Sequence, residues 1–423
     1  MKTTGGVQCG HDASHTHLDH RGKRCRECGN ALQKKCPGCE SLVNYSNAAK
    51  HIKKCVGDKG EEEVESKRVG YLAADFDVQS GTLPLGQYCG ALCEGFPKHF
   101  RKLVATDPTG ECSNIVDAYD AIWGTIFATT RMKLVHTFTS LDAILEAKWE
   151  ELPDMNILVI GNWVYPTAFQ DESNGKVLAE KVYHKLQELE VDRRMHIFPP
   201  LDYVWYFARK VHYYNKLSLM RLPSGIHIIP TLSVPTEHFW KKRLQEFAKD
   251  NNITDLMLKR EMSEISKHVR KMKINALGAL DGRTTGFRWM AQPVLEEFAQ
   301  QREFRMFVIE GRCRWGVATR VMEDDNGVVV HKIGCAPGRK AWDSDGGKEA
   351  AAVAERIVEL VRKDMSHAAK FLRVDMVRRR GGGWWINELE YFGNAFIHFE
   401  TFDNAEEFLD LIVHCVSSWL AGQ

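Results

Sequence analysis

The segment from Asp375 to Asn394 carries acidic residues at a spacing that suits metal binding. An apolar approach to Asp375 predicts a strand, a basic and glycine-rich turn follows, and the return strand ends in Glu388 and Glu390. Because side chains alternate along a strand, the two glutamates share one face. Clustered carboxylates repel one another unless a cation lies between them. We therefore predict that Asp375, Glu388 and Glu390 bind Mg²⁺, which takes oxygen ligands and phosphate; the alternative is a solvated hairpin with ordinary acids.

The composition predicts a soluble globular protein. The chain has 423 residues, of which 44% are hydrophobic and 27% charged, enough for two or three domains. A net charge of +1 excludes a global field that would attract nucleic acid or an anionic membrane. The N-terminal residues lack an apolar signal region, and no run reaches the roughly 18 apolar residues of a membrane span. We expect a cytoplasmic protein without membrane contact, with a nuclear location as the alternative.

Six of the twelve cysteines lie before residue 56, which indicates metal ligands in a compartment without disulfides. Two-residue spacing lets both thiolates of a turn reach one tetrahedral zinc ion. One predicted site has the ligands of a C2HC finger, with its histidine and last cysteine one helical turn apart. These ligands are Cys36, Cys39, His51 and Cys55.

A second zinc site is predicted around the earlier cysteine pair. Its ligands are Cys9, His11, Cys25 and Cys28, with His15, His17 and His20 as alternatives to His11. A rival arrangement binds one ion through Cys25, Cys28, Cys36 and Cys39, and reduced cysteines without metal are the remaining alternative. Because four-ligand zinc sites have no open position for catalysis, this region is predicted to dock a macromolecule, either a protein or peptide or a nucleic acid.

The elements that must position the acidic hairpin follow an α/β pattern. We expect a zinc-binding module at 1–56, a charged linker at 57–68, an α/β domain at 69–222 and a second α/β domain at 223–423. The first α/β domain has a buried strand at 156–160 and an aromatic amphipathic helix at 201–214. The expected order in the second is a strand at 226–229, a helix at 237–249, a strand at 255–259, a strand or hinge at 290–295, a strand region at 302–320, a helix through Val353 and Ile357, the hairpin, and a helix from near Asp403.

That order resembles the nucleotide-binding part of the ATP-grasp superfamily over roughly 200–423. Lys259, in L-M-L-K-R-E-M-S, resembles the lysine that reaches nucleotide phosphates, and the loop after it offers Ser263 and Ser266 to phosphate. The strand R-E-F-R-M-F resembles the E-x-R strand of the second lobe, through Glu303 and Arg305. A-Q-P-V-L-E-E-F resembles the hinge whose backbone pairs with adenine, here Gln292, Pro293, Val294 and Leu295.

The resemblance implies an ATP-grasp fold, in which two α+β lobes grip the nucleotide after an α/β pre-ATP-grasp domain. Two departures stand out. The loop after Lys259 lacks the glycines often found there, and Glu390 occupies a position where the family usually has asparagine. We expect the extra negative charge to be balanced by Mg²⁺, Arg305 or Lys332.

The implied activity is that of an ATP- and Mg²⁺-dependent ligase that activates a carboxylate as an acyl phosphate for attack by an amine, forming ADP. Lys259 and Arg305 would be catalytic, and ATP, Mg²⁺ and Zn²⁺ are the expected cofactors. Two alternatives are a kinase that phosphorylates a hydroxyl group and a zinc-finger adaptor with a non-catalytic nucleotide domain. At the level of residues, Lys259 could instead end an edge strand, and Glu303 with Arg305 could form a cross-strand pair on a wet face.

Overall fold

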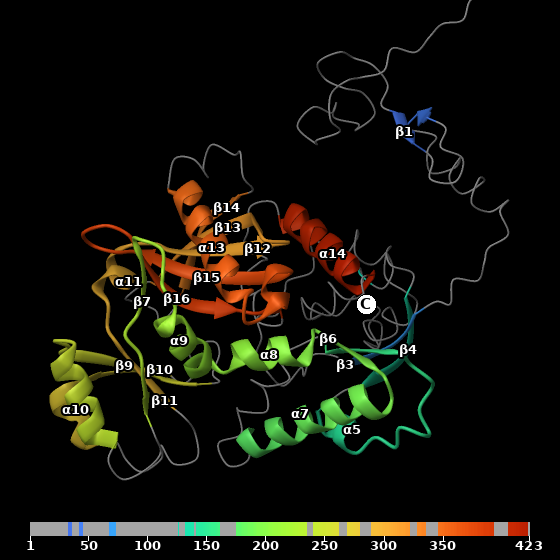
Figure 1. Ribbon diagram of the computed structural model, residues 1–423, viewed down its shortest axis with the longest axis horizontal. Coiled ribbons are helices and arrows are strands. Elements are labelled where there is room, and N and C mark those ends of the chain that lie inside the picture. The colour runs from blue at the N-terminus through green and yellow to red at the C-terminus, as the bar shows by residue number, and fades with distance from the viewer. Residues whose placement is uncertain are drawn as a thin grey trace, which may run out of the picture. The chain divides into compact units, whose positions relative to one another are not determined.

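The computed structural model divides the chain into two compact units, Met1–Ser66 and Lys67–Gln423 (Figure 1). In the first unit, β1 (Gln33–Lys35) pairs with β2 (Leu42–Asn44) in an antiparallel ladder. All eight predicted zinc ligands lie outside the described residues. The structure describes residues 33–35, 42–44, 67–72, 126, 132–138, 141–160, 175–234, 240–261, 269–279, 289–321, 328–335, 346–392 and 405–421.

The second unit begins with a parallel sheet in the order β4-β3-β5-β6. Its strands are β3 (Arg68–Leu72), β4 (Lys133–Phe138), β5 (Ile157–Ile160) and β6 (His196–Phe198). The continuous apolar run of β5 is typical of a parallel strand that is covered on both faces. The observed strand confirms the one predicted at 156–160. Helix α5 (Leu141–Leu145) and α7 (Gly175–Asp192) pack beside each other, and α7 buries one face through Val182, Leu186 and Leu189.

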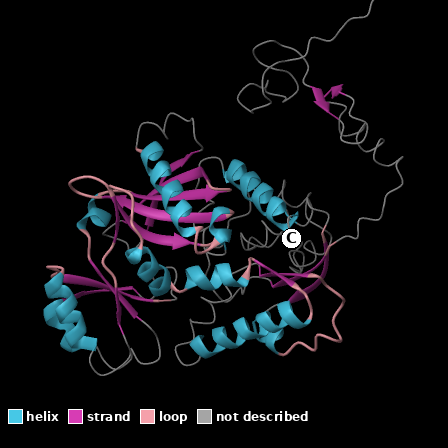
Figure 2. Ribbon diagram, viewed as in Figure 1, coloured by secondary structure: helices cyan, strands magenta, loops and turns pink. Residues whose placement is uncertain are grey.

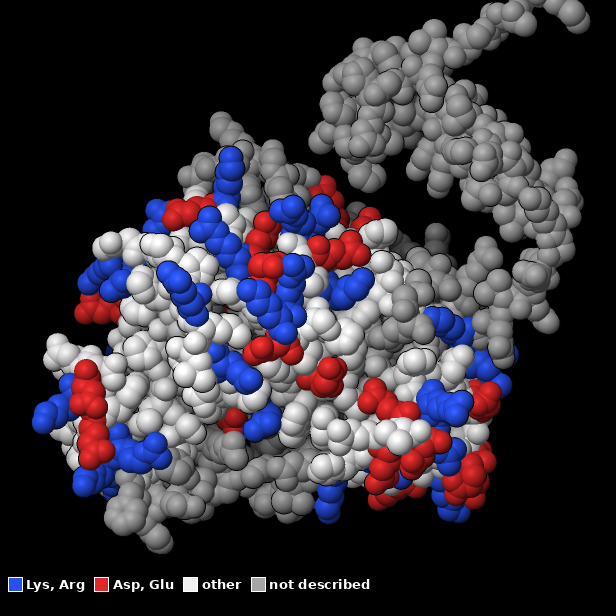
Figure 3. All heavy atoms as spheres, in the orientation of Figure 1, with Lys and Arg blue, Asp and Glu red and all other residues white. Residues whose placement is uncertain are grey.

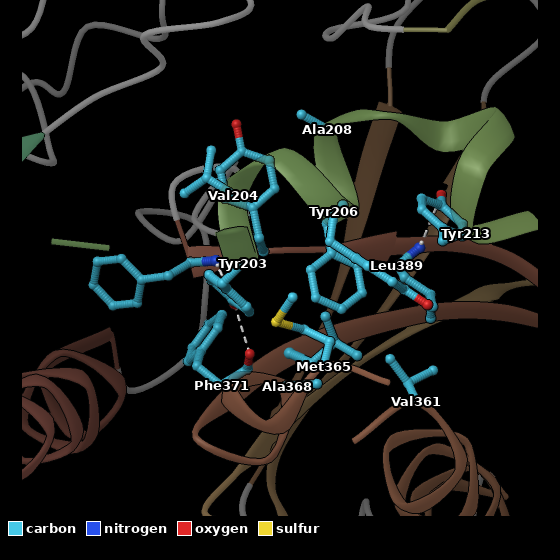
Figure 4. Close-up of a cluster of buried hydrophobic side chains, with 14 of the residues drawn as sticks. Tyr203, Val204, Tyr206, Ala208, Tyr213, Val361, Met365, Ala368, Phe371 and Leu389 are labelled. Atoms are coloured by element: carbon cyan, nitrogen blue, oxygen red, sulfur yellow. Dashed lines mark hydrogen bonds between the residues drawn. The ribbon is translucent and has the colours of Figure 1, made fainter. Parts of the chain in front are cut away.

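The aromatic segment forms two helices where one was expected. Helix α8 (Leu201–Ala208) ends at Arg209, whose φ of −86° and ψ of 77° are not helical, and α9 (Lys210–Leu219) begins at the next residue. The prediction that the rings pack in a core is confirmed. Tyr203 donates a hydrogen bond to the carbonyl oxygen of Phe371 at 2.6 Å (Figure 4). The break redirects the chain, so that Lys210 is buried at the start of α9.

An antiparallel sheet follows in the order β10-β9-β11-β8. Its strands are β8 (Leu232–Val234), β9 (Asp255–Arg260), β10 (Val269–Lys273) and β11 (Trp289–Pro293). Strand β9 alternates between buried and half-buried residues, which places Leu256 and Leu258 in the core and Lys259 on the opposite face. The amphipathic helix α10 (Trp240–Asp250) packs against β8, and the 3-10 helix η3 (Ile274–Ala279) follows β10. The strand predicted at 255–259 is confirmed.

The acidic hairpin belongs to a six-stranded sheet in the order β14-β13-β12-β15-β16-β7. Strands are magenta in Figure 2. Only β7 is parallel to its neighbour among these strands. Helix α13 (Gly347–Val361) packs against β12, β13 and β15. The other elements are α11 (Glu296–Gln300), η5 (Ser366–Ala369) and α14 (Ala405–Ala421). The strands are β7 (Ile226–Ile228), β12 (Glu303–Ile309), β13 (Arg312–Val321), β14 (Val328–Cys335), β15 (Phe371–Arg378) and β16 (Trp384–Glu390).

The turn between β15 and β16 depends on glycine. Gly381, Gly382 and Gly383 all have positive φ, a conformation that other residues rarely adopt. A Cβ atom on Gly383 would clash with the carbonyl oxygen of Gly225, and the N–H of Trp384 donates to that same oxygen at 2.7 Å. The glycines therefore let the turn lie against the start of β7.

On the face shown in Figure 3, basic and acidic side chains are interspersed over the described surface. This mixture agrees with the formal net charge of +1. Within the described ranges, no helix is both long and apolar enough to cross a membrane.

Candidate active site

Two sheets contribute to one buried cluster of charged side chains. Lys259 extends from β9, and its Nζ lies 3.7 Å from Glu388 Oε1 and 3.4 Å from Asn387 Oδ1, both on β16. Strand β9 lies between β10 and β11, so the alternative that Lys259 protects a sheet edge is wrong. The lysine therefore bridges the four-stranded and six-stranded sheets.

The register of the hairpin places the predicted carboxylates beside one another. Asp375 on β15 is opposite Glu388, and Arg373 is opposite Glu390. The register shifts between Asp375 and Met376, as in a β-bulge. Asn387 is therefore the extra residue of β16, with no residue opposite it on β15. The bulge brings the Asn387 side chain into the cluster, where Nδ2 donates to Glu303 Oε1 at 2.6 Å. Strict alternation of side chains along β16 could not predict that Asn387 would join the cluster.

Asp375 is bound by an arginine that the sequence analysis missed. Arg373 donates from Nε and Nη2 to the two carboxylate oxygens, each at 2.8 Å, and both side chains are almost fully buried. Arg305 Nε lies further away, at 4.0 Å from Asp375 Oδ2. The sequence did contain a signal for this ion pair, because Arg373 and Asp375 are two residues apart on one strand and such residues share a face.

Glu388 and Glu390 share a second missed cation, Lys210. Its Nζ lies 3.0 Å from Glu388 Oε1 and 3.7 Å from Glu390 Oε1, and the lysine is 6% exposed. Glu388 and Lys210 are 178 residues apart, so sequence spacing could not pair them. The expectation that Mg²⁺, Arg305 or Lys332 would balance the extra carboxylate therefore did not include Lys210.

The two glutamates titrate differently because of their surroundings. Burial raises the pKa of Glu390 to about 7, with Glu388 adding to the rise and Lys210 opposing it. Burial also acts to raise the pKa of Glu388. The positive charges of Lys210 and Lys259 outweigh the effect of burial, so the pKa of Glu388 is lowered. A hydrogen bond joins the two side chains. At neutral pH the pair therefore favours an ionised Glu388 beside a partly protonated Glu390.

Glu303 and Arg305 lie on one face of β12. Arg305 Nη2 is 3.3 Å from Glu303 Oε2, and the side chains are 16% and 14% exposed, so the wet-face alternative is wrong. Burial raises the pKa of Glu303, with Arg305 opposing this and Asp375 adding to it. The cluster thus contains as many bases as acids: Lys210, Lys259, Arg305 and Arg373, against Glu303, Asp375, Glu388 and Glu390.

The expected hinge at 292–295 covers the last two residues of β11 and the two residues before α11. Gln292 is buried, and its Nε2 donates to Thr231 Oγ1 at 2.9 Å. Pro293 ends the strand, and the N–H of Val294 donates to the carbonyl oxygen of Asp255 at 3.0 Å. Leu295 immediately precedes α11. Because the Val294 N–H is bonded within the protein, it is poorly suited to pair with adenine.

Three predicted phosphate-binding residues have no described side chain. Ser263 and Ser266 lie outside the described residues, and Lys332 lies on β14 without a described side chain. Their roles stay predictions.

The carboxylates suit Mg²⁺ in chemistry but are already paired with protein cations. Throughout the ranges that the structure describes, no group of three or more His, Cys, Asp or Glu side chains is arranged to hold a metal ion. Asp375, Glu388 and Glu390 supply hard oxygen donors, as Mg²⁺ requires. An ionised carboxylate has about four lone-pair sites, so the bonds to Arg373 and Lys210 leave acceptor capacity. The donor set therefore fits Mg²⁺ in its chemistry, although the three described side chains are not arranged as a metal site.

Comparisons with known proteins bear on the fold. No family model and no curated protein matches the sequence. The structure is similar to that of the D-cycloserine synthetase DcsG, with 14% identity and a TM-score of 0.52, covering 84% of this chain and all of that chain. At this identity the likeness shows the fold alone.

Two further solved structures have TM-scores below the level that indicates a shared fold. The ATP-grasp ligase PsnB, complexed with a minimal precursor, is 12% identical with a TM-score of 0.45, covering 83% of this chain and 99% of that chain. D-alanine–D-alanine ligase from Bacillus anthracis is 12% identical with a TM-score of 0.44, covering 84% and 98%.

Proposed function

We propose that this chain is an ATP- and Mg²⁺-dependent ligase that joins a carboxylate to an amine and releases ADP and phosphate. The observation that carries the proposal is the contact of Lys259 with Glu388 and Asn387 across two sheets. A cation on one sheet and carboxylates on the other suit a polyphosphate bound with its metal ion between them. The likeness to DcsG supports the same fold class.

The carboxylate substrate would attack the γ-phosphorus of ATP, breaking the bond to the β-phosphate oxygen and forming an acyl phosphate. The amine would then attack the acyl carbon, phosphate would leave, and the amine would lose a proton. Such transfer depends on positioning and charge neutralisation more than on covalent help from the protein. No nucleophilic side chain is therefore required.

The buried charges have distinct roles in this scheme. Lys259 would bind phosphate oxygens as a point charge, and the planar fork of Arg305 would bind a phosphoryl group or the substrate carboxylate. Asn387 would orient Glu303 through the 2.6 Å hydrogen bond and accept from Lys259. Mg²⁺ would be held by Asp375, Glu388 and Glu390, and it would neutralise charge on the phosphates.

The N-terminal cysteine and histidine residues would bind zinc and dock a macromolecular target for the ligase. Their spacing supports this proposal. Metal analysis of the purified chain would test it: about two zinc ions per chain are expected, and a zinc-free chain would contradict it.

The reaction is tested by incubating the protein with ATP, Mg²⁺, candidate acids and candidate amines while ADP, phosphate and coupled product are measured. Glu388→Gln is expected to abolish turnover. The control is Glu359→Gln, which changes an exposed glutamate on α13. Full activity in the Glu388 variant would disprove the metal assignment, and a stable phosphomonoester product would identify a kinase.

One observation favours a second candidate, an adaptor that binds nucleotide without turnover. The carboxylates of the cluster are already paired with Lys210 and Arg373. Calorimetric titration with ATP and Mg²⁺ separates the candidates: binding without ADP formation, across the candidate substrates, supports the adaptor. Absence of binding would contradict both.

A further inference from the structure

Helix α9 is docked on the acidic end of β16. Strand β7 pairs with β16 from Trp384 to Ile386, so among the described strands the next residues of β16 have no partner on that side. Helix α9 supplies a substitute, because the Tyr213 hydroxyl accepts a hydrogen bond from the N–H of Leu389 at 3.3 Å (Figure 4). Lys210 lies three residues earlier, which is about one helical turn, and it contacts the residues on either side of Leu389.

Two features of α9 attract the carboxylates. The Lys210 ammonium group lies within 3.7 Å of both glutamate side chains, and its side chain is 8% exposed. It occupies the first position of the helix, where the helix dipole gives a partial positive charge. A lysine this deeply buried is costly unless its charge is paired, so the contact with the two acids is a requirement of the fold as well as of the site.

Lys210 therefore does electrostatically what a bound metal ion would do for these two acids. A divalent ion that entered alone would be repelled by Lys210 and by Lys259, whose Nζ is 3.7 Å from Glu388 Oε1. An ion that enters with a polyphosphate brings negative charge that offsets this repulsion. The bases of the cluster already equal its acids in number, so a lone divalent ion would leave an excess of buried positive charge.

We propose that Lys210 is a positioning residue that makes metal binding depend on nucleotide: it satisfies Glu388 and Glu390 in the free protein, so that Mg²⁺ enters only with the phosphates. The inference rests on the proposed function and adds a specificity device to that site. It predicts that the charge of Lys210, and not its bulk, excludes free metal ions.

The test is titration with Mn²⁺ in the absence of nucleotide, followed by the electron paramagnetic resonance signal of the free ion. The wild-type protein is expected to show no Mn²⁺ binding at the cluster up to the highest concentration titrated. Lys210→Met should bind Mn²⁺ with a Kd at least about tenfold below that concentration. Lys210→Arg keeps the charge and should behave as wild type. Lys216→Met is the matched control, because Lys216 is on the same helix, is half exposed and pairs with Asp364.

A second substitution covers the case in which the methionine variant does not fold. Lys210→Gln keeps a hydrogen-bond donor without the charge, and it should also gain Mn²⁺ binding. Removing both charges in Lys210→Met/Glu390→Gln should restore wild-type behaviour, because the excess carboxylate is gone. Circular dichroism reports whether each variant is folded.

Equal Mn²⁺ affinity in the wild type and the folded Lys210→Gln variant would overturn the inference. So would an arginine variant that binds Mn²⁺ as tightly as the glutamine variant. The proposed function is tested separately by ATP binding and turnover in the wild type. Loss of that function would leave the Mn²⁺ comparison interpretable, and a failed Mn²⁺ comparison would leave wild-type turnover unaffected.

Discussion

Replacement of Arg373 by methionine tests how much the fold depends on the ion pair inside the acidic hairpin. The arginine donates to both oxygens of Asp375 at 2.8 Å, and the two side chains are 3% and 2% exposed. Methionine preserves an apolar stem but has no donor. Asp375 would keep Arg305, whose Nε is 4.0 Å away, beyond ordinary hydrogen-bond distance.

The expected cost is large because the substitution leaves a buried charge poorly compensated. Removing one partner of a buried ion pair destabilises a protein by about 3–5 kcal/mol. The double variant Arg373→Met/Asp375→Asn removes the charge as well as its partner. We expect it to recover at least about 2 kcal/mol relative to the single variant, since contacting residues are not additive.

The assay is urea unfolding of the full chain, followed by circular dichroism. Arg362→Met is the control, because Arg362 pairs with Glu359 at a shorter 2.7 Å while the side chains are 50% and 54% exposed. That exposed pair should contribute about 0–1 kcal/mol. If both arginine substitutions cost the same, or if the double variant is no more stable than Arg373→Met, burial does not determine the strength of the pair.

Three further predictions concern the strands around the cluster. Lys259→Met should weaken ATP binding about 10- to 100-fold in calorimetry, because it removes the charged hydrogen bond to a phosphate oxygen. Lys271→Met, at an exposed position, is the control and should not weaken binding. Equal affinities of the two variants would contradict the assigned phosphate contact. Gly383→Ala should lower the free energy of unfolding by about 1–3 kcal/mol more than Gly382→Ala. Both glycines have positive φ, but only at Gly383 would the new Cβ atom meet backbone atoms. Equal losses of unfolding free energy would refute the clash. Burial raises the pKa of Glu390 to about 7, so protonated Glu390 stabilises the metal-free protein below pH 4.5, and this contribution is lost as pH rises through 7. The stability of Glu390→Gln relative to wild type should therefore increase from pH 5 to 8 in thermal unfolding, and a pH-independent difference would show that Glu390 titrates normally.

Local patterns predicted most of the strands and helices that carry the cluster. The apolar run at 156–160 forms β5, the segment 255–259 forms β9, and the acidic hairpin forms β15 and β16. These predictions succeed because alternation and glycine-rich turns act over a few neighbouring residues. The aromatic segment at 201–214 was harder, because nothing in its apolar pattern marks the break at Arg209.

The sequence by itself predicted which residues would meet a nucleotide, namely Lys259, Arg305 and the three acids of the hairpin, and that role stays a prediction. Only the tertiary structure decided which cations meet those acids. Lys210 reaches Glu388 across 178 residues because helix α8 ends at Arg209 and α9 then lies against β16. Such contacts depend on how helices and sheets pack, a long-range property that residue spacing does not encode, whereas strand alternation is local and can be read along the chain.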